Sequence, residues 1–123
     1  MLELALHLIP ILVASTLLLA GTEIAAAASS SRIAETGAFL LGNAHRCGVA
    51  DERLVRAGKV IRQLIVAAAD DASEQTAAKS RFAEIFRASA HPEGDGHALM
   101  PPCKTVLTQF ERLEQFRDHA GLR

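Results

Sequence analysis

From residue 29 onward, apolar residues recur at alternating spacings of four and three, and this rhythm is interrupted at three places. Such spacing places apolar side chains on one face of an α-helix. The chain is rich in Ala and Leu and contains five Phe but neither Trp nor Tyr, a mixture that favours helices over sheets. The pattern therefore predicts an all-α domain over residues 29–123.

Four helices are predicted, because recognisable starts and stops divide the domain into residues 30–47, 51–69, 72–90 and 102–119. Ser30 or Ser31 is expected to cap the first helix, and Gly48 to end it in a left-handed conformation. Asp51 stands where a cap for the second helix is expected. Residues 71–74 have the spacing of a capping box for the third.

The segment from His91 to Met100 contains Pro92, Gly94 and Gly96 and is predicted to be a loop that cannot sustain a helix. Pro101 and Pro102 then open the last helix, since proline is pre-organised for the first helical turn. Short connections between four helices favour an up-down-up-down four-helix bundle.

Two cysteines fall at helix ends, Cys47 at the end of the first predicted helix and Cys103 at the start of the fourth. An up-down-up-down order brings these two ends together, and both residues lie in phase with apolar faces. A Cys47–Cys103 disulfide is therefore predicted. It would contribute about 4 kcal/mol on the chain-entropy model. The alternative is a pair of buried free thiols.

Residues 1–28 form a hydrophobic segment that is typical of a signal peptide. An apolar run from Leu8 to Ala20 is followed by the small residues Ala25–Ala28, so cleavage is expected near Ser29. The start departs from the usual pattern, because residues 1–7 carry Glu3 and neither Lys nor Arg.

Two alternatives for this segment are a membrane anchor and a buried N-terminal helix, since residues 4–28 are long enough to span a thin bilayer. The signal peptide predicts a periplasmic or secreted domain. The anchor predicts a domain that faces the periplasm and is attached to the membrane through residues 1–28.

Charge and motifs exclude several functions. With 13 basic and 14 acidic residues the net charge is −1, which offers no electrostatic footprint for nucleic acid. The chain has no haem-attachment motif and no two-cysteine redox motif, and Gly94-Asp95-Gly96 is too acidic to cradle phosphate. We therefore predict neither enzymatic activity nor a bound cofactor.

Two groups of side chains are candidate binding sites. His45, His91 and His97 are expected at the same end of the bundle as the cysteines, and such residues are preferred ligands of zinc and copper. This arrangement suggests a metal or cofactor carrier. Arg53 and Arg56 belong to a basic stripe, and Phe116 lies off the apolar face of its helix, so these three are candidates for contact with a partner.

The leading hypothesis, reached by elimination, is a non-enzymatic, exported binding, adaptor or chaperone-like protein of the bacterial envelope that acts on an unidentified protein partner. In general character the chain resembles the small disulfide-linked periplasmic helical chaperones that acid stress induces. The resemblance concerns fold class and assigns no residues. A metal carrier and a membrane-anchored accessory subunit are the alternatives.

Mass spectrometry of protein purified from its native compartment tests these predictions together. We expect an intact mass that lacks residues 1–28, no mass gain on alkylation in denaturant without reductant, and no stoichiometric metal. An uncleaved N-terminus would support the anchor. Two alkylated thiols together with bound metal would support the carrier.

Overall fold

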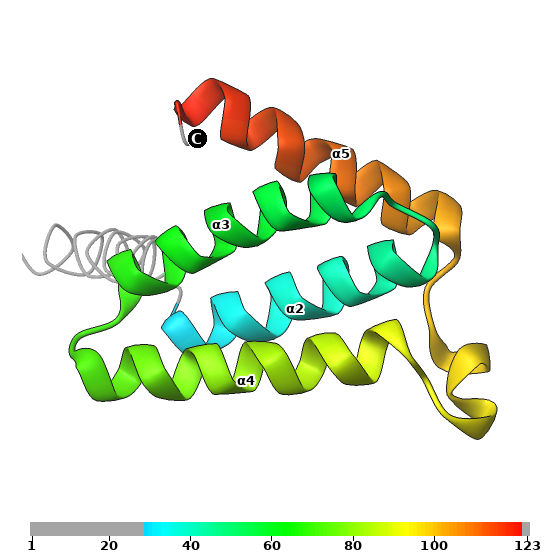
Figure 1. Cartoon of the computed structure of the whole chain (residues 1–123), viewed down its shortest axis with the longest axis horizontal. Coiled ribbons are helices and arrows are strands. Elements are labelled where there is room, and N and C mark those ends of the chain that lie inside the picture. Colours follow the sequence, from blue (N-terminus) through cyan, green and yellow to red (C-terminus); the bar gives the residue numbers. More distant parts are fainter. Residues whose placement is uncertain (1–28, 122–123) are drawn as a thin grey trace, which may run out of the picture.

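A computed structural model describes residues 29–121, and these form four α-helices and one short 3₁₀ helix without a strand (Figure 1). The elements are α2 (Ser30–Arg46), α3 (Asp51–Ala68), α4 (Ala72–Ala90), η1 (Gly94–Leu99) and α5 (Cys103–Ala120). The all-α prediction is confirmed, and every helix begins and ends within one residue of its predicted bounds. The predicted signal peptide or anchor lies outside the described residues.

Consecutive helices run in opposite directions, and α2 lies between the other three (Figure 1). Helix α2 packs most extensively against α4, then against α3 and α5. Within the part of the chain that the structure describes, α4 and α5 do not contact each other. In a square bundle these two helices would be neighbours. The four helices are therefore grouped around α2, with a gap between α4 and α5.

Small residues of α2 make its central position possible. Gly42 faces the backbone of α4 so closely that an added Cβ would lie 2.5 Å from the Cβ of Ser89 and 2.8 Å from the carbonyl oxygen of Phe86. Gly37 faces α3, where an added Cβ would lie 2.8 Å from Cγ2 of Ile61. The two glycines thus accept neighbouring helices on different sides of α2.

The core contains Leu41, Ile65, Val106 and Phe110, which come from three helices. On α2 the spacing of four and three residues in the sequence predicts one apolar face of Ile33, Gly37, Leu40, Ala44 and Cys47, and the observed burial differs from it. Gly37 and Ala44 are buried, whereas the other three are half-buried. Ala34, Ala38 and Gly42 are buried instead of lying on a solvated face. A helix that is packed from three sides has no single apolar face.

Local signals placed the helix ends well and misplaced some caps. Ser29, rather than Ser30 or Ser31, caps α2, because its Oγ accepts a hydrogen bond from the amide of Arg32 at 3.1 Å. Ala50 occupies the N-cap of α3 without a side-chain bond, so Asp51 is the first helical residue and not the cap. There its charge is favourable beside the positive end of the helix dipole.

Two further expectations concern the ends of α4 and α5. The capping box is present in part: Asp71 accepts from the amide of Glu74 at 2.8 Å, whereas the Glu74 carboxylate accepts, also at 2.8 Å, from the amide of Asp70, the residue before the cap. Pro102 is the N-cap of α5 and precedes the first helical turn. The predicted loop contains the short 3₁₀ helix η1, so the expectation that this segment sustains no helix holds for an α-helix only.

We expect Gly42→Ala to lower the free energy of unfolding by about 1–3 kcal/mol, because the new methyl group would push the α4 backbone away. Gly58→Ala is the matched control: its Cβ would meet the side chain of Leu41 at an ordinary 3.7 Å. This control should gain up to about 1 kcal/mol from helix propensity. Urea denaturation measures both, and equal effects would contradict the close packing of α2 and α4.

Candidate functional site

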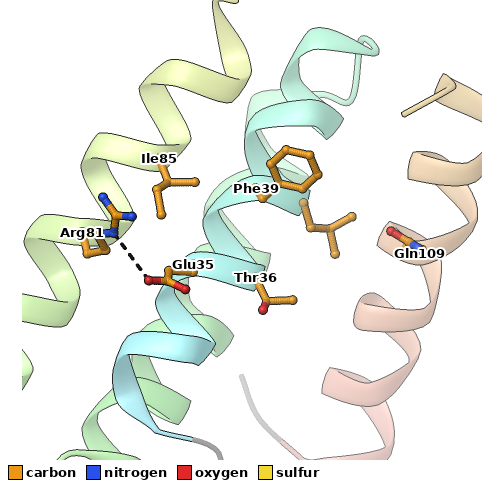
Figure 2. A pocket seen from close by; sticks show the side chains of 7 residues that line it. Glu35, Thr36, Phe39, Arg81, Ile85 and Gln109 are labelled. Carbon is orange, nitrogen blue, oxygen red and sulfur yellow. Dashed lines mark ion pairs between the residues drawn. The ribbon is translucent and has the colours of Figure 1, made fainter. Parts of the chain in front are cut away.

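An open groove lies along α2, between α4 and α5, and encloses about 620 Å³ (Figure 2). Helix α2 supplies four lining residues, α4 supplies two and α5 one: Glu35, Thr36, Phe39, Leu40, Arg81, Ile85 and Gln109. The groove exists because α4 and α5 both pack on α2 without meeting each other.

Apolar side chains form much of the groove. Phe39 is 42% exposed although it is a large aromatic residue in the middle of the central helix. Leu40 and Ile85 are half-buried beside it. Exposed apolar surface in a concave site is typical of a place where a ligand or partner is bound.

Charged groups form one edge of the groove. Nε of Arg81 on α4 lies 3.6 Å from Oε1 of Glu35 on α2, an ion pair visible in Figure 2. The same guanidinium lies 3.4 Å from Oε1 of Glu84, one turn along α4. Two carboxylates thus share one guanidinium. Glu84 does not itself line the groove. With Glu84 included, the three charged side chains at this edge carry one excess negative charge, and all three are accessible to water.

At one end of the molecule, Cys47 and Cys103 form a disulfide with their Cα atoms 5.5 Å apart. It joins the C-cap of α2 to the first residue of α5, the same pair of helix ends that topology predicts. The bond attaches α5 to α2 beside the groove, because Gln109 lies less than two turns beyond Cys103.

A polar network that the sequence did not reveal reinforces this joint. Asn43 is completely buried, and its Nδ2 donates to the carbonyl oxygen of Phe39 at 2.9 Å. Arg46 donates from Nε and one terminal nitrogen to Oδ1 of Asn43, and also to the carbonyl oxygen of Pro101 at 2.8 Å. The network connects the last turn of α2 to the segment that enters α5.

Two of the three candidate metal ligands are neighbours. The rings of His45 and His91 lie 5.5 Å apart between centroids, in an edge-to-face arrangement. Nδ1 of His45 also lies 3.8 Å from the carboxylate of Asp51. The side chain of His97 is outside the described part. Among the side chains that are described, no group of three or more potential ligands could hold a metal ion.

The candidate partner residues are separated in the structure. Arg53 is held within the fold: its Nε donates to Oε2 of Glu114 at 3.0 Å, a second nitrogen donates to Oε1, and its guanidinium lies over the ring of Phe110. Arg56 is exposed on α3. Phe116 is 47% exposed on α5. A role for these three in binding a partner stays a prediction.

The groove residues were not predicted from the sequence, and there is a physical reason for this. Glu35 and Arg81 are 46 positions apart in sequence, and their pairing follows from the packing of α4 on α2. Phe39 is an aromatic residue within a helical pattern, which ordinarily predicts burial. The sequence did contain one indication. Gly37 and Leu40 share a helix face, and Phe39, which lies between them in sequence, is not on that face.

Comparisons of the chain with models of protein families, with curated proteins and with solved structures gave no match. Over residues 29–121, none of the helices is both long enough and apolar enough to cross a membrane.

The Arg53–Glu114 contact predicts a specific dependence of stability on pH. Hydrogen bonding from Arg53 lowers the pKa of Glu114 below its ordinary value of 4.5. The pair therefore stabilises the fold fully above that value, and the stabilisation disappears as the pH falls through the lowered pKa. We expect Glu114→Gln to lower the thermal midpoint at neutral pH and to match the unsubstituted protein in strong acid.

Glu111→Gln is the control for this experiment, since Glu111 is exposed one turn earlier on α5. Its effect at neutral pH should be the smaller one. A Glu114→Gln deficit that persists unchanged in strong acid would contradict the proposed electrostatic origin.

Proposed function

We propose that this chain is a non-enzymatic, exported binding protein of the bacterial envelope, stabilised by one disulfide, and that it holds a segment of a protein partner in the groove between α4 and α5. The observation that carries the proposal is the open apolar groove over α2, with Phe39 exposed inside it. Adaptor and chaperone-like roles both fit such a site.

The size of the groove defines what it accepts. Its α2 residues extend from Glu35 to Leu40, which corresponds to about 7.5 Å along the helix axis. This length suits one bulky apolar side chain and its neighbours rather than a whole helix. Single anchors of this kind contribute much of the affinity at protein interfaces.

The edge of the groove defines the charge that should accompany this anchor. Glu35 and Glu84 together exceed the charge of Arg81, so a basic residue beside the anchor would gain from the surplus carboxylate. The partner segment is therefore an apolar residue, preferably aromatic or leucine, flanked by Lys or Arg.

Two observations support the exported part of the proposal. A disulfide and a signal-like segment over residues 1–28 both agree with a periplasmic or secreted location.

The two alternatives have less support. A metal carrier would use His45 and His91, which are adjacent, but the disulfide takes both sulfurs out of the ligand set. A membrane-anchored accessory subunit that faces the periplasm would bind its complex through the same groove and differ in retaining residues 1–28.

A displayed peptide library panned against the exported protein tests the proposal. Selected peptides should contain a bulky apolar residue next to Lys or Arg. Their binding should shift the amide resonances of the groove residues. Phe39→Ser should weaken the best peptide more than tenfold, because the anchor loses its aromatic contact.

Phe116→Ser is the matched control, since Phe116 is 47% exposed and Phe39 42%. Binding by this variant should remain within about twofold of the unsubstituted protein. The reverse pattern would move the docking surface to Arg53, Arg56 and Phe116. A panel without enrichment of apolar residues would refute a peptide-binding groove.

A further inference from the structure

A second concave region lies between α3 and α4, away from the groove over Phe39. It consists of two adjoining hollows of about 360 and 330 Å³. Ile65 and Phe82 line the first, and Val66 and Ala67 line the second. Arg62 and Lys79 line both hollows, so we refer to the whole as the Arg62–Lys79 cleft.

The packing of the helices explains why this cleft is open. Helices α3 and α4 both rest on α2 and touch each other only slightly. Ile65 is completely buried at the bottom of the cleft, whereas Val66 remains 44% exposed. The cleft therefore offers apolar surface that the fold itself does not cover.

Arg53 pairs with Glu114, Arg81 with Glu35 and Arg117 with Asp118. Arg62 and Lys79 are among the basic side chains that form no ion pair in the described part of the chain. Two positive side chains from different helices thus converge on one apolar hollow, and a ligand carrying negative charge would complement them.

The surroundings favour a single small ligand over a membrane surface. Asp70 and Asp71 lie in the turn between α3 and α4, about two helical turns from Arg62 and Lys79 respectively, and Glu74 lies on α4 about one and a half turns before Lys79. These carboxylates would be repelled by an anionic bilayer. A single anion bound between Arg62 and Lys79 avoids most of this repulsion through distance and screening.

We propose that the Arg62–Lys79 cleft binds one molecule of an anionic amphiphile, whose carboxylate or phosphate monoester contacts Arg62 and Lys79 while its alkyl chain covers Val66 and Phe82. Both halves of the ligand are needed. The cations supply charge-assisted hydrogen bonds, and the exposed apolar floor supplies the hydrophobic contribution. This site is independent of the peptide-binding groove.

Decyl phosphate, 1-decanol and inorganic phosphate are suitable probes, titrated below the micelle concentration into the isotopically labelled exported protein. Decyl phosphate should bind at least tenfold more tightly than either of the others and should shift the amides of Ile65, Phe82 and Ala83. Equal binding of 1-decanol would show that the cations only shield the apolar floor with their stems, and would overturn the proposal.

The double variant Arg62→Gln with Lys79→Gln should lose at least tenfold in affinity for decyl phosphate. The double variant Arg56→Gln with Lys59→Gln is the matched control, because it removes the same charge from exposed positions of α3 outside the cleft. Its affinity should stay within about twofold. Thermal unfolding confirms that both variants fold.

Vesicles of phosphatidylglycerol provide the comparison with a membrane. Flotation assays should show no association that depends on Arg62 and Lys79. The opposing outcome is that the control double variant weakens vesicle binding and decyl phosphate binding as much as the cleft double variant does. In that case the basic surface of α3 as a whole would determine binding, and a specific site in the cleft would be refuted.

Discussion

The close approach of α2 and α4 at Gly42 is the contact on which the rest of the structure depends. Because Gly42 has no side chain, the backbone of α4 packs directly on α2 at this position. Gly37 accepts Ile61 of α3 on another side. Helix α2 consequently becomes the centre of the domain, and α5 is left to cover a remaining side. The gap between α4 and α5 is the direct result.

Polar and covalent bonds at one end compensate for the missing contact between α4 and α5. The last helix contributes Val106 and Phe110 to the core, and these two are its buried residues. The disulfide fixes its first residue, while Arg46 holds Pro101 and Asn43 in position. A helix with few buried residues is thereby kept in a defined orientation, and the groove keeps its α5 wall.

The sequence was sufficient for features that depend on local or topological rules. Helix bounds follow from caps and breakers, and the common position of Cys47 and Cys103 follows from the alternating helix directions. The sequence was insufficient where the packing of the helices buries a polar residue and exposes an apolar one. On α2 the polar Asn43 is completely buried while the apolar Phe39 is exposed, because a hydrogen-bond network satisfies the first and a gap between helices exposes the second. Periodicity records neither cause.

Helix α4 borders both concave regions and gives them opposite charge. Its Arg81 and Ile85 face the groove, where Glu35 and Glu84 leave a negative surplus, whereas its Lys79 and Phe82 face the cleft, which is positive. Only Ala78, Ser89 and Ala90 of this helix are buried. Phe82 and Phe86 are half-buried and pack against the core, so they contribute to folding as well. The exposed Lys79 and Arg81 do not. The charges that distinguish the two concave regions are thus carried by residues of α4 that the core does not need.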